Sequence, residues 1–406
     1  MTDKFAIPEP IYDTLEAIEL GESPIPSYVG SDDYTITKTF LLAYRGSPDT
    51  FHSYRREVDR FLQWVYLVAK KTLVTVDRED MENFVRFCLK PPSYWITTKM
   101  VAKFIHREGE KIANPEWRPF VAKVSKEARL KNKKPSVKHY RLSDPGVQAI
   151  LRVLSSYYSF LEMEDYAPTN PVKRIRQKSK FIRRKASADP IRRLSELQWD
   201  YVLETAEKMA DKDPLHQRTL FIMSALYGMY LRISELAESE QWSPVMKHFF
   251  QDNDGHWWFK TVGKGNKERD ISVSQEMLKA LKRYRKSMGL PALPSLGDNE
   301  PLIPKQKGTG GISSTRHLRD IVQKCFDEAE YRLRIDGMDD DANRLQSATV
   351  HWLRHTGISD DVKTRPKEHV RDDAGHSSSA ITDRYIDIEK RDRHASAKRK
   401  KLRPIN

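Results

Sequence analysis

Cysteine is scarce in this chain of 406 residues, with Cys88 and Cys325 as its only two examples. Two cysteines cannot supply a disulfide-rich scaffold or a zinc module built on several thiolates. Long apolar runs are missing too, since none approaches the ~20 residues that a membrane-spanning helix needs. The first residues, MTDKFAIPEPIYD, have neither the basic start nor the apolar stretch of a secretory signal. These absences predict a reduced, cytoplasmic protein without a membrane partner.

Three familiar catalytic motifs are absent or incomplete. The segment GKGNK lacks the GxxxxGK[ST] pattern of a nucleotide-phosphate loop. His351 and His355 have the i, i+4 spacing of zinc ligands, but Trp352 stands where HExxH has its glutamate. Arg354 would also bring a positive charge beside the metal. No cluster of acidic residues resembles a two-metal nuclease site, so we expect neither a metal nor another cofactor.

Positive charge is what the chain has in excess. It contains 71 Lys and Arg against 57 Asp and Glu, a net charge of +14, and its 38% of hydrophobic residues suffices for folded cores. This balance predicts a polyanionic partner.

The densest basic segment, KRIRQKSKFIRRK, has no acidic residue and is interpreted either as a solvated linker or as a contact to DNA phosphates. The candidate DNA-binding residues are Lys173, Arg174, Arg176, Lys178, Lys180, Arg183, Arg184 and Lys185.

Changes in residue pattern divide the chain into four parts. Residues 1–35, rich in proline and acidic residues, are expected to be an N-terminal extension. Residues 36–172 show apolar spacings of three and four that predict an all-helical domain. A basic interdomain linker over 173–189 leads to a mixed domain over 190–406, which ends in a basic tail. The expected fold class is mainly α with a small β-sheet or hairpin.

Within the mixed domain, the apolar stretch 215–239 predicts one long helix, and residues 256–262 and 269–274 predict two strands joined by a turn. Four separate segments of this domain concentrate basic residues, and the last of them also contains a tyrosine. Each residue alone has an ordinary explanation, such as a surface arginine or a core tyrosine, but the set in this order indicates a site. Its members are Arg232 in LRISEL, Lys264 in GKGNKER, His351 and Arg354 in HWLRHTG, and His376 and Tyr385 in GHSSSAITDRY.

In these residues the sequence resembles the tyrosine recombinase (phage integrase) family. The family order of Arg, Lys, His-x-x-Arg, His/Trp and Tyr is met in full, and the flanking text RISEL, VGKGNKER, LRHT and GHSS agrees. The resemblance is strong over 190–390 and weaker over 36–180. The sequence departs from the family pattern at three positions. Tyr230 stands where the family often has a glycine, Ala374 where it commonly has a leucine, and Ile381 where it frequently has a threonine. None of them removes a catalytic group.

The resemblance implies a site-specific DNA recombinase that cuts and rejoins duplex strands through a 3′-phosphotyrosyl intermediate, without metal or ATP. Tyr385 would be the nucleophile, and Arg232 and Arg354 would hold the nonbridging phosphate oxygens. His351 is the expected base for the tyrosine proton, and Lys264 the acid for the departing 5′ oxygen.

Supporting roles are assigned to three further residues. His376 is expected to hydrogen-bond a phosphate oxygen, and Glu235 to orient an arginine, most simply Arg232. His355 is interpreted as a structural residue.

The resemblance further implies a specific duplex DNA site, a tetramer on DNA that exchanges C-terminal segments, and accessory DNA-bending proteins as additional partners. Two alternatives remain open: a type IB topoisomerase-like enzyme that relaxes supercoils, and a catalytically silent DNA-binding factor. The intact constellation argues against the silent factor. A protein–DNA adduct and joined products would separate the three.

Overall fold

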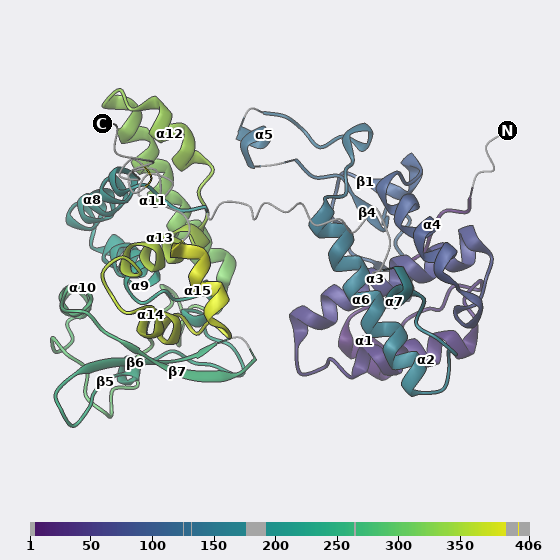
Figure 1. Ribbon diagram of the computed structural model, residues 1–406, viewed down its shortest axis with the longest axis horizontal. Coiled ribbons are helices and arrows are strands. Elements are labelled where there is room, and N and C mark those ends of the chain that lie inside the picture. Colours follow the sequence, from purple (N-terminus) through teal and green to yellow (C-terminus); the bar gives the residue numbers. More distant parts are fainter. Residues whose placement is uncertain are drawn as a thin grey trace, which may run out of the picture. The chain divides into compact units, whose positions relative to one another are not determined.

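The computed structural model describes residues 5–124, 126–130, 132–175, 192–263, 265–386 and 397. The chain divides into two compact units, Met1–Ser187 and Ala188–Asn406. Both are mainly helical with short strands, so the predicted fold class is confirmed (Figure 1). Among the described residues, no helix combines the length and the apolar character needed to cross a bilayer.

The first unit is built around two amphipathic helices that pack against each other, α3 (Pro48–Trp64) and α6 (Asp144–Met163). Both have a proline in the first turn, where the missing N–H costs nothing, and Ser143 caps α6 by accepting a hydrogen bond from Gly146 N. The other helices of this unit are α1 (Leu15–Leu20), α2 (Ser31–Leu42), α4 (Arg78–Leu89), α5 (Lys126–Leu130) and α7 (Pro171–Ile175).

Two pairs of short strands interrupt this helical unit, which the sequence had suggested to be all-helical. The pairs are β1 (Ile96–Thr97) with β4 (Phe120–Val121) in parallel, and β2 (Phe104–Arg107) with β3 (Glu110–Ala113) in antiparallel. Glu108 and Gly109 at the β2–β3 turn both have positive φ, the geometry of a tight hairpin. Strands of two to four residues are too short to give a readable alternation.

The described part of this stretch, residues 5–35, contributes buried side chains to the core of the first unit, so the expectation of a separate extension was wrong. Ile11 and Tyr12 are fully buried, and the ring of Tyr12 stacks on Tyr34 with centroids 5.0 Å apart. The backbone N–H of Ile11 donates to Asp59 on α3 at 3.0 Å. Short apolar stretches between prolines carry little periodicity, although tertiary packing buries them.

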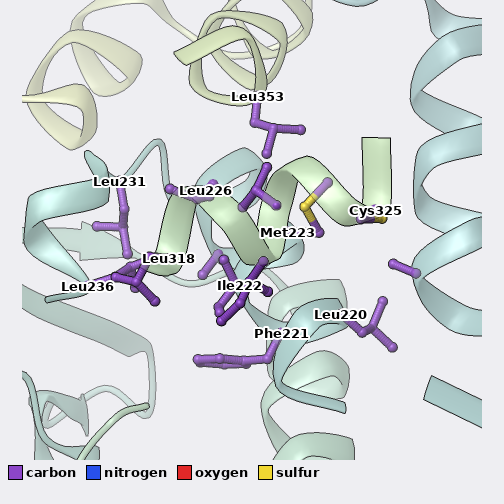
Figure 2. Packing of buried hydrophobic residues seen from close by; sticks show 14 of the residues in the cluster. Leu220, Phe221, Ile222, Met223, Leu226, Leu231, Leu236, Leu318, Cys325 and Leu353 are labelled. Carbon is purple, nitrogen blue, oxygen red and sulfur yellow. The ribbon is translucent and has the colours of Figure 1, made fainter. Parts of the chain in front are cut away.

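In the second unit, α9 (Gln217–Gly228) lies at the centre of the core. Figure 2 shows its buried side chains Leu220, Phe221, Ile222, Met223 and Leu226, together with Leu318, Cys325 and Leu353 from neighbouring helices. Four helices contact α9: α8 (Glu196–Lys212), α10 (Gln275–Ser287), α11 (Thr315–Ile335) and α13 (Val350–Asp361). Gly357 permits the close approach of α13, because a Cβ there would lie 2.1 Å from the carbonyl oxygen of Tyr227.

A three-stranded antiparallel sheet in the order β5-β6-β7 also belongs to this unit. The predicted strands are present as β6 (Trp257–Gly263) and β7 (Lys267–Ser272), while the three-residue β5 (Phe249–Gln251) was not anticipated. The remaining helices are α12 (Asp339–Gln346), α14 (Lys367–Ala374) and α15 (Ser379–Ile386). Of these, α14 packs against both β7 and α15 (Figure 1).

The long helix expected over 215–239 ends at Gly228. Tyr230 then adopts a left-handed backbone conformation with φ of 50°, which a helix cannot accommodate. Arg232 follows in extended conformation and precedes a 3₁₀ turn (Ile233–Glu235). This break turns the chain so that Arg232 starts a new element rather than continuing the buried helix.

Candidate active site

Five of the six predicted catalytic residues line one open cleft of about 1130 Å³ in the second unit. They come from four elements, namely the turn after α9, helix α13, the α14–α15 connection and helix α15. The five are Arg232, His351, Arg354, His376 and Tyr385. Lys264 lies outside the described residues, and the neighbouring Gly263 and Gly265 both line the cleft.

One buried carboxylate holds two arginines at the cleft. Glu235 accepts from Arg232 Nη1 at 2.9 Å, and from Arg269 Nη1 and Nη2 at 3.0 and 2.8 Å. Burial alone would raise the pKa of Glu235, but Arg269, aided by Arg232, holds that pKa below its usual value. The side chain of Arg232 keeps 28% of its surface exposed, so part of its guanidinium still faces solvent.

Arg354 is oriented by main-chain carbonyls. Its Nη1 donates to the carbonyl of Tyr230 and its Nη2 to that of Ala374, at 2.6 Å for the latter. Burial, followed by repulsion from Arg232, lowers the pKa of Arg354 to about 10. A guanidinium has five N–H donors, so these two bonds leave further donors for a ligand in the cleft.

Helix α13 presents two histidines, one turn apart, near Tyr385. The ring centroids of His351 and His355 are 6.1 Å apart. His355 Nδ1 lies 2.6 Å from the hydroxyl oxygen of Tyr385, a hydrogen-bond distance. Burial lowers the pKa of His351, with Arg354 and Arg232 adding to the effect. The interpretation of His355 as merely structural therefore needs correction, since its ring contacts the proposed nucleophile.

His376 follows the left-handed Gly375 that ends α14. Its Nδ1 lies 2.9 Å from the buried hydroxyl of Thr382, and its ring stacks on Tyr385 with centroids 5.8 Å apart. Burial, with Arg354 and Arg232 next in size, lowers the pKa of His376 to about 4. The ring is therefore neutral at pH 7, with Nε2 left to face a ligand.

A hydrogen-bonded network behind the cleft fixes α14 and the turn that contains Tyr230. Arg365 donates to Asp373 at 2.6 Å, to Asp361 at 3.1 Å and to the hydroxyl of Tyr230 at 2.9 Å. Arg269 also donates to the carbonyl of Asp373 at 3.0 Å. The charged stretch between 363 and 373 thus connects β7, α13 and α14.

Most of the candidate DNA-binding residues of the basic segment, namely Arg176, Lys178, Lys180, Arg183, Arg184 and Lys185, lie outside the described residues. Lys173 and Arg174 lie on α7 of the first unit, so the predicted linker begins within a helix. Lys173 pairs with Glu162 at 3.0 Å, and both side chains are partly exposed. Such a surface pair is weak and leaves the lysine available to other anions.

The described residues contain one group that could hold a metal ion, formed by Asp252, Asp254 and His256. It lies on the turn between β5 and β6, and none of its members lines the cleft. Asp252 already accepts from the N–H of Asp254, the N–H of His256 and Nε1 of Trp258. These hydrogen bonds close the turn and account for the proximity of the three side chains.

Residues 192–392, from just before α8 to beyond Tyr385, match the model of the phage integrase family. The chain belongs to the phage integrase family. The matched segment contains all six predicted catalytic positions, including Lys264.

Several known proteins of this kind are similar to the chain. The tyrosine recombinase XerC of Pediococcus pentosaceus is 24% identical over 263 residues, which cover 61% of this chain and 73% of the relative. The integrase of transposon Tn1549, solved in complex with a circular intermediate DNA, is 14% identical with a TM-score of 0.52, covering 89% of this chain and 98% of that one. The XerH site-specific recombinase, in a post-cleavage complex with a palindromic difH substrate, is 13% identical with a TM-score of 0.50, covering 98% and 99%. At these identities the two structural likenesses show the fold.

Sequence reasoning overlooked Arg269 of this integrase site and gave His355 only a structural role. Arg269 ends the segment VGKGNKER, which had been noted for its text but not for this side chain. His355 stands directly after Arg354, and only the packing of α13 on α15 brings it to Tyr385.

Proposed function

We propose that this integrase-family protein is a site-specific DNA recombinase that cuts and rejoins duplex strands through a covalent 3′-phosphotyrosyl bond to Tyr385. The observation that carries the proposal is the position of Tyr385 in a cleft that four arginines and three histidines also line. That combination suits attack on a phosphodiester. The target DNA site, which these residues do not specify, decides whether the reaction results in integration, excision, inversion or dimer resolution.

The positive charge of the cleft explains how the chain would stabilise the transition state. Attack on phosphorus concentrates negative charge on the nonbridging oxygens, and fixed guanidinium donors are well suited to bind it. Arg232, held by the carboxylate of Glu235, and Arg354, held by main-chain carbonyls, supply such donors. Neutral His376 can donate a further hydrogen bond from Nε2 while Thr382 occupies Nδ1. In this proposal the arginines take the role that metal ions have in two-metal phosphoryl-transfer sites.

Two proton transfers complete the proposed reaction. Lys264, outside the described residues, would protonate the departing 5′ oxygen, and a histidine of α13 would take the proton of the phenol. The sequence favoured His351 as that base, whereas His355 lies within hydrogen-bond distance of Tyr385. Because the phosphotyrosyl bond conserves the free energy of the broken phosphodiester, a new 5′ hydroxyl can reseal the strand without ATP.

The proposed partners are a specific duplex DNA site and further copies of this chain, assembled as a tetramer on the DNA, with accessory DNA-bending proteins as an additional partner. The basic segment 173–185 would contact phosphates between the two units. The proposed location is the cytoplasm, with the protein associated with the nucleoid when it is bound to DNA.

Covalent capture on DNA tests the proposal. Full-length protein is incubated with a library of nicked duplex fragments made from the DNA flanking its gene, so that a cleaved strand cannot be resealed. Adducts that survive denaturation are sequenced through their DNA, and mass spectrometry maps the phosphotyrosine. We expect the adduct on Tyr385, at the 3′ end of one recurring sequence, and joined products when an acceptor strand is supplied.

Two variants control this experiment. Tyr385→Phe should bind the recovered DNA normally and form no detectable adduct, since one oxygen atom is lost. The matched Tyr331→Phe, at an exposed position on α11, should react like the wild type. Relaxation of supercoiled plasmid without joined products would favour the topoisomerase-like alternative, and specific binding with no adduct would favour the silent factor.

A further inference from the structure

The hydroxyl of Tyr385 contacts a histidine outside the family's six-residue pattern. Its oxygen lies 2.6 Å from His355 Nδ1, and the two rings are 5.7 Å apart at 41°. Tyr385 is 6% exposed, so its phenol is held within the protein rather than extended into solvent. A short contact to a buried nucleophile places His355 at the reacting atom.

Helix geometry explains why His355 rather than His351 reaches the phenol. The two histidines are one turn apart on α13, so they share a face, but α15 packs against the later turn. Within the described residues, the structure records a ring contact from His351 to His355 and no hydrogen bond from His351 to Tyr385. His351 is also the more exposed of the two rings and faces the open cleft.

The charges around His355 suit transfer of a proton away from the phenol. Arg354 interacts electrostatically with Tyr385, and His355 interacts with His376. Arg232 and Arg269 also line the same cleft, and His351 lies one turn earlier on α13. These cations favour a developing phenolate, and a neutral imidazole with its hydrogen on Nε2 leaves the Nδ1 lone pair for the proton.

We propose that His355 is a catalytic residue that holds the Tyr385 hydroxyl through Nδ1 and takes its proton as the phenol oxygen attacks phosphorus. This inference rests on the proposed recombinase function. In the forward step, the O–H bond of Tyr385 breaks and its proton moves to Nδ1, while the phenol oxygen bonds to phosphorus. The bond from phosphorus to the 5′ oxygen breaks, and that oxygen leaves as a hydroxyl with a proton from the proposed acid, Lys264.

On resealing, the steps reverse. A 5′ hydroxyl attacks the phosphotyrosine and gives up its proton to the acid group, and the imidazolium of His355 returns its proton to the released phenol. His351 then serves as a hydrogen-bond donor to a phosphate oxygen instead of as the base.

Single-turnover kinetics test this assignment. The cleavage rate of the DNA site recovered by covalent capture is measured from pH 5 to 9 for the wild type and for His355→Gln, His351→Gln and His369→Gln. Glutamine at 355 can still accept the phenol hydrogen bond but cannot take the proton. We expect His355→Gln to cleave about 10²–10³-fold more slowly, the usual size of a lost general base, with DNA affinity within about twofold. The decrease of the wild-type rate at acid pH should disappear in this variant and persist in His351→Gln. His369, exposed on α14, is the matched control and should behave as wild type.

A second variant separates proton transfer from packing. His355→Ala opens space beside the phenol, and added imidazole should restore its cleavage rate in proportion to the fraction of neutral imidazole. A wild-type rate in His355→Gln, loss of the acidic decrease in His351→Gln alone, or failure of imidazole to act on a folded, DNA-binding His355→Ala would overturn the inference. Absence of a Tyr385 adduct with the wild-type protein would instead overturn the proposed function, and this inference with it.

Discussion

Arg60 in the first unit and Arg354 in the second are both buried, at 8% and 5% exposure, and both donate to main-chain carbonyls. Their surroundings differ in charge. Arg60 pairs with Glu57 at 2.5 Å and lies over the ring of Phe120 at 4.6 Å. Burial works against its charge, but Glu57, with smaller contributions from Cys88, Tyr140 and Asp59, outweighs burial, and the pKa of Arg60 is raised. Burial and Arg232 together lower the pKa of Arg354 to about 10.

This difference distinguishes a charge that stabilises the fold from one that awaits a ligand. The first unit pairs Arg60 with Glu57, and Lys103 with Asp59, so each of these two cations has its own carboxylate. At the cleft, Arg232 and Arg269 share the single carboxylate of Glu235, and Arg354 donates to neutral carbonyls. The cleft therefore retains an excess of positive charge, which a phosphate group would neutralise.

The largest expected effect comes from removing each buried arginine in turn. Arg60→Ala leaves the buried Glu57 with only its contact to the exposed Arg56, so the first unit should lose about 3–5 kcal/mol of unfolding free energy. Arg354→Ala should cost the second unit less than about 2 kcal/mol, because the loss of two hydrogen bonds is partly offset by relief from Arg232. The same variant should slow Tyr385 adduct formation by about 10²–10³-fold.

Urea unfolding followed by hydrogen-exchange mass spectrometry reports on the two units separately and supplies the comparison. Arg60→Lys, which keeps the charge next to Glu57, is the control for lost packing. Equal destabilisation of the two units by their arginine-to-alanine changes would show that Arg354 is a structural cation, and the contrast drawn here would not hold.

A smaller effect is expected from Glu235→Gln. The amide keeps one acceptor oxygen but removes the charge between Arg232 and Arg269, and the lost charged hydrogen bonds should cost about 1.5–3 kcal/mol. Sulfate should restore stability by occupying the cleft, and more strongly than chloride at the same ionic strength. Glu57→Gln, in the first unit, should show no such preference beyond the general stabilisation by sulfate. Thermal melts in both salts provide the measurement, and equal sulfate responses of the two variants would refute an anion site.

The sequence predicted those helices and strands whose residue patterns lie within the element or directly beside it. The apolar spacing within α6, with Ser143 and Pro145 at its start, and the strands on either side of the GKGNKE turn needed no tertiary information. Residues 5–35 could not be predicted in the same way, because their burial depends on partners far away in the chain, such as Asp59 for Ile11.

The candidate site shows the same division between what residue patterns predict and what tertiary packing determines. Residue types and their order identified Arg232, Arg354 and Tyr385, because phosphoryl transfer requires such groups in any arrangement. Which side chain contacts which depends on packing. Arg269 reaches Glu235 only because β7 lies beside the turn after α9, and His355 reaches Tyr385 only through the contact of α13 with α15.

The smallest effect concerns His376 and pH. In the folded protein its pKa is lowered to about 4, while an unfolded histidine titrates near ~6.5. Between these values the unfolded chain binds more protons, so unfolding free energy should decrease as pH falls from about 6.5 toward 4. For a half-buried ring, discounted for solvent screening, we expect a loss of roughly 1–2 kcal/mol. His376→Gln lacks this titration, so its stability should decrease less over that range, with His351 titrating equally in both proteins.

NMR titration of the ring should give a midpoint near 4 in the free protein and a higher one with sulfate, since a bound anion favours the imidazolium. A midpoint near 6.5 without sulfate would mean that the neighbouring arginines do not act on His376, and that the excess charge of the cleft is already neutralised.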